Sequence, residues 1–506
     1  MSRSMKKDAI ASYSNLFISI LTGITVVPII ESHIGKNYFG IYQFIFTLTA
    51  YTAIMNMGLT KTVERYVAKY AVRKEEDKES LIVSMVVSIY LMASLVLVLI
   101  ISVLYMQFGN IFAFTGDELM IAKQCFLLAS VNATLNIPAM SFLAHLKGRG
   151  RFFITYNFHS VYIVSRMIMV ILMLNLGYGI VTVFLVDLIL NQTLNLSYAL
   201  FSIIKYKIKL NIFKYDKELF IKLFQFTLFV SVGSIGDLLY WNTDNIILGI
   251  MSTSDVIAEY ALSQSLMTYF IRYTTAFTGL LLPRFMEKAE EVEKEHRAKH
   301  MGLAFIKATR IHGFIMSFAV VNFIVFGRDL IRVWVGNDYQ MTYTYSIILL
   351  IPMWIAFSQV SGIDILYVMN EHKTRIIIYT FNAFANIFLT VLLVKLYGPI
   401  GAAISTSVTM IIGTIILLNI YYSRLFQYKL WDYFREVYLV NLLFSVLVIG
   451  LGVVFNQEIK PFISVGHEFV NLVVRGILFN ILFVLVILFG WLRTSERKAL
   501  LSNFNR

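Results

Sequence analysis

The strongest constraint on the fold is a succession of fourteen apolar runs, each long enough to cross a membrane, that polar segments separate. A transmembrane helix needs about 20 apolar residues, whereas a barrel strand needs about 10 residues of alternating character. The runs are too long and alternate too weakly to be barrel strands. They are 9–31, 39–60, 80–107, 119–145, 152–175, 179–203, 222–250, 257–282, 304–326, 342–369, 376–396, 399–422, 437–456 and 468–491. The sequence therefore predicts an all-α integral membrane protein with about 14 transmembrane helices.

The composition supports this prediction and excludes several classes of function. Apolar residues make up 58% of the chain and charged residues 14%, and the mean hydropathy is +0.73, which excludes a soluble globular protein. The one cysteine, Cys125, permits neither an intramolecular disulfide nor a cysteine-based metal site. No nucleotide-binding loop, metalloprotease motif or nucleophile elbow occurs in the sequence. We therefore expect no catalytic residue, no metal and no cofactor.

The positions of the basic residues predict the orientation of the chain in the membrane. Most of the 43 Lys and Arg residues lie on loops at the same side as the N-terminus, above all at 65–80, 205–218 and 284–300. Cytoplasmic loops carry such an excess of positive charge. Both termini are therefore expected in the cytoplasm, and the topology explains the net charge of +13 without a nucleic-acid partner. Two arginines on a predicted outer loop, Arg328 and Arg332, depart from the rule.

The sequence also contains a weak internal repeat, with landmarks that recur in the same order at a nearly constant offset. This predicts an N-lobe of six spans over 1–210, a pseudo-symmetric C-lobe over 211–425, and two further helices with a cytoplasmic tail over 426–506. Repeated lobes around a central cavity are typical of transporters, in which one lobe rocks against the other. The recurring pairs are Tyr42 and Tyr260, Arg65 and Arg284, Asp117 and Asp338, and Gly177 and Gly398.

Ionisable side chains within the predicted spans are the main candidates for function, because a charge in hydrocarbon is costly unless it is paired or hydrated. Arg166 and Asp187 lie at one depth on neighbouring spans, and so do Asp237 and Arg272, so each set is expected to pair. The full set is Arg166, Asp187, Asp237, Asp244, Arg272, Asp364 and Arg475.

Two interpretations of these charges remain open. In the first, Arg166, Asp187, Asp237, Arg272 and Asp364 line a water-filled cavity, where the arginines bind an anionic head group through their forked donors. In the second, the ion pairs only fix helix packing.

Four residues have further roles that are similarly open. Asp237 and Asp244 are candidates for coupling transport to a proton or cation, although Asp244 could equally cap the outer end of its span. Arg65 and Arg284, at the inner ends of helices, are candidates for a cytoplasmic gate or a head-group contact, and interfacial anchoring explains them about as well.

Several segments resemble the polysaccharide transporters of the multidrug/oligosaccharidyl-lipid/polysaccharide (MOP) exporter superfamily. They are TDNIILG at 243–249, AEYALSQSL at 258–266, LLPRF at 281–285, IGKNYFGIYQF at 34–44, MGLTKTVERYVAKY at 57–70 and KLYGPIGAAISTSV at 395–408. A count of 14 helices resembles the lipid-linked precursor flippases of that superfamily, in which the last two helices lie beside the bundle.

The resemblance implies a flippase that moves an undecaprenyl-diphosphate-linked oligosaccharide, such as an O-antigen, capsule or exopolysaccharide repeat unit, from the inner to the outer leaflet of a bacterial or archaeal cytoplasmic membrane. Membrane lipids and other polysaccharide-assembly proteins are the further partners expected. An inside-negative potential of 100 mV favours outward movement of a negative charge by about 2.3 kcal/mol.

Two other functions remain open. One is a cation-coupled multidrug or small-molecule antiporter of the same superfamily, for which Glu259 would join the acidic residues of the cavity. The other is a membrane glycosyltransferase or polymerase, which typically needs a large outer loop or a soluble catalytic region. The short predicted loops make this the weaker alternative.

Overall fold

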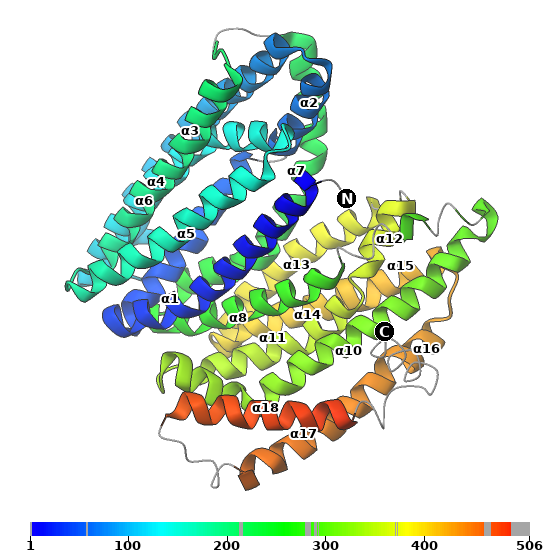
Figure 1. The fold of residues 1–506 in the computed structure, drawn as a ribbon. Coiled ribbons are helices and arrows are strands. Elements are labelled where there is room, and N and C mark those ends of the chain that lie inside the picture. Colours follow the sequence, from blue (N-terminus) through cyan, green and yellow to red (C-terminus); the bar gives the residue numbers. More distant parts are fainter. Residues whose placement is uncertain are drawn as a thin grey trace. The chain divides into compact units, whose positions relative to one another are not determined.

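The computed structural model describes residues 3–56, 59–211, 216–278, 285–287, 291, 293–369, 371, 373–459 and 467–486. Every regular element in this part of the chain is helical (Figure 1). Ten of these helices are long and apolar enough to cross a membrane. The predicted all-α class of integral membrane protein is therefore confirmed.

The first helix, α1 (Arg3–Ala50), contains two of the predicted spans. Gly35 interrupts it with φ 79° and ψ 164°, a backbone conformation that favours glycine, at the polar segment that separates runs 9–31 and 39–60. If α1 counts as two spans, and the long helices α7 (Lys217–Met251), α8 (Ser254–Thr278) and α18 (Glu468–Val486) are added to the ten, the described part of the chain agrees with the predicted number of about 14.

The chain forms two compact units, of which the first comprises 1–261 and 383–402. In this unit α4 (Gly116–Gly148) packs against α6 (Ile180–Tyr206) and α3 (Glu76–Ile111), and α1 packs against α5 (Phe152–Asn175). Its further helices are η1 (Tyr51–Asn56), α2 (Leu59–Arg73), α7, the start of α8, the second half of α13 (Lys373–Tyr397) and the start of α14 (Ile400–Thr409). A core between α2, α3, α4 and α6 includes the fully buried Val67, Val86 and Tyr90.

The second unit comprises 262–382 and 403–506. Its central helix, α10, contacts both α17 and α18, which lie side by side in Figure 1. The apolar contact between the three helices includes Val321, Val448 and Phe483. The described helices of this unit are the remaining parts of α8, α13 and α14, together with α10 (Lys294–Val335), α11 (Gln340–Ser358), α12 (Ser361–Met369), the π-helix η2 (Met410–Leu417), α15 (Leu418–Leu425), α16 (Leu430–Tyr433), the π-helix η3 (Phe434–Leu439), α17 (Val440–Ile459) and α18.

The basic segment expected as a loop at 65–80 is mostly helical. Helix α2 covers its first half, with Leu59, Thr62, Val63 and Val67 buried on one face. These positions follow the helical period, so the apolar face packs onto the unit while the charged face remains exposed. The polar segment therefore forms an amphipathic helix, a class of element typical of a membrane surface.

Left-handed glycines recur at corresponding turns of the predicted repeat. Gly116 and Gly336 have φ values of 56° and 96°, and Gly177 and Gly398 have φ values of 85° and 70°. The members of each pair are separated by about the offset found in the sequence, and each pair precedes or follows equivalent predicted spans. The lobe boundaries 1–210, 211–425 and 426–506 stay a prediction.

Candidate functional site

A buried ion pair joins α5 and α6 within the first unit. Arg166 donates from Nε and Nη2 to the two carboxylate oxygens of Asp187, with Nη2–Oδ2 at 3.0 Å, and Nη2 also donates to the hydroxyl oxygen of Tyr42 on α1 at 3.1 Å. The side chain of Arg166 is 16% exposed and that of Asp187 6%. The predicted Arg166–Asp187 contact is therefore present, and three helices position it.

The geometry of this pair defines what Arg166 can bind. A guanidinium group has five N–H donors in a rigid fork. In Arg166, Nε and Nη2 donate hydrogen bonds to Asp187 and Tyr42. An incoming phosphate or carboxylate must therefore bind through Nη1 or displace Asp187. Arg166 would have a bidentate oxyanion partner both when Asp187 is bound and when an incoming anion has replaced it. Asp187 can therefore act as the counter-ion of Arg166 while no anion is bound.

A second buried carboxylate lies on α7. Asp244 is 1% exposed and accepts hydrogen bonds from the Tyr260 hydroxyl at 2.6 Å and the Thr390 hydroxyl at 2.9 Å. These groups come from α8 and α13, so three elements of the first unit meet at Asp244. Tyr42 and Tyr260 were paired in the repeat, and each hydroxyl contacts a buried charged side chain.

Asp364 lies on α12, directly after a break in the helical path. Helix α11 ends at Ser358. The amide of Gln359 then donates to the carbonyl oxygen of Thr414, within the π-helix, at 2.6 Å and accepts from the amide of Asn419 at 2.8 Å. These bonds hold the Gln359 side chain, at the break, against the π-helix and α15. Broken helices of this kind often line transporter binding sites.

The carboxylate of Asp364 is only partly satisfied. Its Oδ2 is buried and has no hydrogen-bond partner among the residues that the structure describes. A buried carboxylate oxygen without a donor costs free energy in the folded state, and such groups often serve binding or transport.

The remaining predicted residues are placed as follows. Arg272 is exposed on α8, and Arg65 is exposed on the amphipathic helix α2. The side chain of Asp237 and the whole of Arg284 lie outside the described residues, so the expected Asp237–Arg272 pair stays a prediction.

Sequence reasoning missed a buried charge cluster at the end of the first unit. Glu79 is fully buried and accepts from Nε and Nη2 of Arg149, with Nε–Oε1 at 2.6 Å, and it hydrogen-bonds Nε2 of His145 at 2.6 Å. Nδ1 of His145 also contacts the Ser202 hydroxyl at 3.1 Å. The signal in the sequence was the acidic residue at the first turn of α3 together with the basic turn at 146–151.

Within the described ranges, no three His, Cys, Asp or Glu side chains gather in a way that could hold a metal ion. Three carboxylates are separate candidates for function: Asp187 with its arginine and Asp244 with its hydroxyl donors in the first unit, and Asp364 beside the helix break in the second unit.

Comparison with known proteins relates these features to a family. A family model described as polysaccharide biosynthesis protein matches residues 5–289. The chain is 21% identical over 442 residues to the uncharacterized membrane protein EpsK of Bacillus subtilis (strain 168), with 83% of each chain covered.

Two solved structures share the fold over most of their length. The lipid II flippase MurJ in an inward closed conformation is 16% identical, covers 95% of this chain and 98% of its own, and has a TM-score of 0.69. An inward-facing multidrug resistance MATE family transporter of the MOP superfamily is 14% identical, covers 85% and 100%, and has a TM-score of 0.64. The chain belongs to the polysaccharide biosynthesis protein family, and it has the fold of the MOP exporter superfamily.

Proposed function

We propose that this protein is a flippase that moves undecaprenyl-diphosphate-linked oligosaccharide from the inner to the outer leaflet of the cytoplasmic membrane. The observation that carries the proposal is the partly buried guanidinium of Arg166, held by Asp187 and Tyr42, in a member of the polysaccharide biosynthesis protein family. A cationic group inside the membrane is costly. The guanidinium of Arg166 would compensate the negative charge of a cargo whose diphosphate must cross the hydrocarbon region.

In this mechanism the lobes 1–210 and 211–425 alternate in exposing a central cavity to the two sides of the membrane. The polyprenyl tail stays in the bilayer while the diphosphate and sugars pass through the cavity. Arg166 exchanges its Asp187 partner for a phosphate oxygen when the cargo binds. Arg272, Asp237 and Asp364 are the further residues assigned to the cavity, and Arg65 and Arg284 are assigned to the cytoplasmic gate.

Asp244 is the first candidate for coupling transport to a proton or cation. It is almost fully buried, and two hydroxyl groups already orient its carboxylate, so binding a cation or a proton there would change the charge of the unit's interior. Asp237 is the second candidate. The membrane potential alone also favours outward movement of the negatively charged cargo.

The proposal includes a location and a mode of action. Both termini lie in the cytoplasm, the protein crosses the membrane many times, and it works without a cofactor and without catalysing a covalent reaction. Membrane lipids and other proteins of polysaccharide assembly are its expected partners.

A cation-coupled multidrug or small-molecule antiporter is the second candidate function. The fold shared with a MATE family transporter and the buried Asp244 favour it. Glu259, which would add a negative charge for a cationic drug, instead forms an ion pair with Lys36. This neutralisation favours an anionic cargo over a cationic one.

Deletion of the gene followed by lipid extraction tests the proposal. The expected result is the loss of surface polysaccharide with accumulation of complete repeat units on undecaprenyl diphosphate at the cytoplasmic side, and their mass identifies the glycan. Unchanged surface polysaccharide without a trapped intermediate, combined with increased sensitivity to cationic drugs, would support the antiporter instead.

A further inference from the structure

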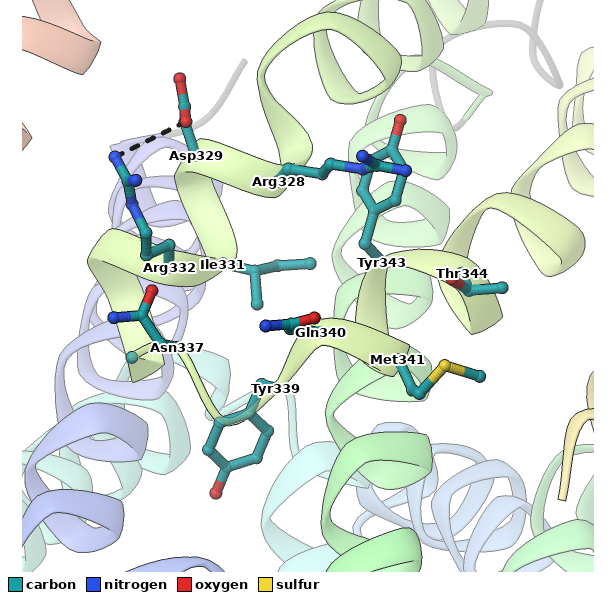
Figure 2. Close-up of a pocket in the computed structure, with 11 residues that line it drawn as sticks. Arg328, Asp329, Ile331, Arg332, Asn337, Tyr339, Gln340, Met341, Tyr343 and Thr344 are labelled. Atoms are coloured by element: carbon teal, nitrogen blue, oxygen red, sulfur yellow. Dashed lines mark ion pairs between the residues drawn. The ribbon is translucent and has the colours of Figure 1, made fainter.

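A cavity of about 410 Å³ lies in the second unit where α10 ends and α11 begins (Figure 2). Its volume falls within the roughly 300–1,000 Å³ range of small-molecule sites. Most of its side chains are polar, and they come from one turn of the chain and the two helices that flank it. The lining residues that matter here are Arg328, Asp329, Arg332, Asn337, Gln340 and Tyr343.

We call this cavity the outer pocket, because its turn lies on the predicted outer loop that contains Arg328 and Arg332. The charges of its side chains leave the outer pocket electropositive. Asp329 is its one acidic lining residue, and Nη1 of Arg475 donates to the Asp329 carboxylate at 3.0 Å. Arg475 is only 4% exposed, so a buried arginine that does not line the pocket neutralises Asp329. Arg332 lies 3.7 Å from Asp329 and 3.6 Å from Glu468, and its side chain stays 39% exposed. These longer contacts hold the guanidinium in place while leaving part of it accessible.

Arg328 is positioned by a different interaction. Its guanidinium carbon lies 4.9 Å from the centroid of the Tyr343 ring, and Figure 2 shows the Arg328 side chain extending to this ring. The Tyr343 hydroxyl in turn donates to the carbonyl oxygen of Ile324 at 2.9 Å, which fixes the ring. Stacking uses the face of a guanidinium and leaves its in-plane N–H groups available to an oxyanion.

We propose that the outer pocket binds an acidic sugar residue of the translocated glycan. The forked donors of Arg328 and Arg332 suit the carboxylate of a hexuronic acid, and the amide groups of Asn337 and Gln340 beside them suit sugar hydroxyls. The proposal rests on the proposed function, in which the α10–α11 turn faces the outer side, away from the basic loops. The pocket then retains the glycan after it has crossed the membrane.

The test uses the full-length protein in nanodiscs of phosphatidylcholine, with digalacturonate as the probe, maltose as the neutral disaccharide and isothermal titration calorimetry as the readout. Wild-type protein is expected to bind digalacturonate and not maltose. Arg332→Ala and Arg328→Ala should each weaken binding by about tenfold or more, and Arg332→Lys, which keeps the charge without the fork, should fall between them and the wild type.

The matched control is Arg435→Ala, which removes the same charge from an exposed arginine on η3, outside the pocket. It should leave the affinity unchanged. Equal binding of maltose, no binding to wild type, or unchanged affinity in both pocket variants overturns the proposal.

Two further arms separate sugar from other oxyanion sources. Inorganic phosphate that displaces digalacturonate at equal concentration, or phosphatidylglycerol nanodiscs that abolish its binding, would assign the site to phosphate or to a lipid headgroup and overturn the sugar assignment. These outcomes are independent of the proposed function, because the deletion phenotype is read from trapped lipid and surface glycan alone.

Discussion

The buried carboxylates of this protein differ in the groups that contact them. Asp187 is bound by a guanidinium fork, Glu79 by a second guanidinium and a histidine, and Asp244 by two hydroxyl groups among its contacts. A guanidinium neutralises a carboxylate directly, whereas hydroxyl donors stabilise the charged form without cancelling it. Asp187 and Glu79 are therefore suited to anion exchange or to packing, and Asp244 is suited to taking up a proton or cation.

The double variant Arg166→Leu/Asp187→Leu tests whether the ion pair is needed for transport or only for helix packing. Replacing a buried ion pair by apolar side chains of similar size is often neutral for stability or stabilising by about 1–4 kcal/mol. We expect the double variant to insert, to keep its melting temperature in detergent, and to lose surface polysaccharide, because the cargo loses its guanidinium.

Arg166→Ala alone is the comparison, and it should also unfold more easily because it leaves Asp187 buried without its cation, at a cost of about 3–5 kcal/mol. Normal export by the double variant would show that the pair only fixes helix packing.

Asp244→Asn tests ion coupling at a single side chain. The amide keeps the size of the carboxylate and can still accept from Tyr260 while contacting the hydroxyl of Thr390, so the fold should be preserved. It cannot carry a negative charge, so transport driven by an imposed proton or sodium gradient in proteoliposomes should fall to background.

Tyr260→Phe is the matched control for Asp244→Asn. It removes one hydrogen bond, worth about 1.5–3 kcal/mol where a charged group is involved, and keeps the carboxylate. Gradient-driven transport should persist in this variant. If the proton and sodium gradients drive transport by Asp244→Asn as they do for the wild type, Asp244 does not couple transport to either ion.

The ion pair of Arg166 and Asp187 could be predicted from the sequence because both residues lie in apolar runs, and depth follows from counting residues along two adjacent helices. The cluster around Glu79 could not be predicted in this way. Glu79 and His145 lie 66 residues apart near helix ends, where a charge is ordinarily solvated, and only the packing of α3 against α4 buries both.

At the scale of the helices, the glycines of the family-like segments are explained by close packing. A Cβ atom on Gly40 would lie 1.9 Å from the carbonyl oxygen of Ser254, and one on Gly249 would lie 2.1 Å from the ring of Phe44. Helices α7 and α8 therefore approach the second half of α1 at distances that only glycine permits. The likeness of these segments to the family reflects packing more than substrate recognition.

Gly40→Ala is expected to destabilise the protein. The added methyl group collides with backbone, which cannot rotate away, so the cost should be at least the roughly 1–3 kcal/mol of ordinary overpacking. Gly450→Ala on α17 is the matched control, because no atom lies within 4 Å of the added Cβ, and it should be neutral or gain up to about 1 kcal/mol. Thermal unfolding in detergent measures both, and equal melting temperatures would contradict the close approach of α1 and α8.

Element positions followed largely from the apolar runs, but two details did not. The apolar runs did not predict that the first two spans form one helix, α1, with a break only at Gly35. Helix α2 lies in a segment that reads as a charged loop because its apolar face contains only every third or fourth residue. Both depend on contacts with neighbouring helices, which hydropathy does not report.

At the scale of the whole molecule, the orientation in the membrane can be tested with the single native cysteine. Cys125 is buried, so Cys125→Ala gives a background without thiols. In that background Tyr178→Cys, at an exposed position of the turn between α5 and α6, should react with an impermeant maleimide in intact cells. Val72→Cys, exposed on α2, should react only after lysis. The reverse pattern would invert the proposed topology.

The two compact units and the recurring left-handed glycines describe the architecture on which the proposed transport rests. The sequence repeat indicated where corresponding turns lie, and the paired glycine conformations agree with it. No sequence motif identifies the cargo. Its identity must be measured with the cargo itself.

Reconstitution of the purified protein with undecaprenyl-diphosphate-linked oligosaccharide in liposomes tests flipping most directly. A membrane-impermeant glycosidase added outside first removes the sugars of the outer leaflet, and its further cleavage over time reports transbilayer movement. The flippase mechanism predicts continued cleavage of the protected pool with wild-type protein and arrest with Arg166→Leu/Asp187→Leu. A protected pool that stays intact with wild-type protein, under an imposed membrane potential and under proton or sodium gradients, would contradict the proposed function.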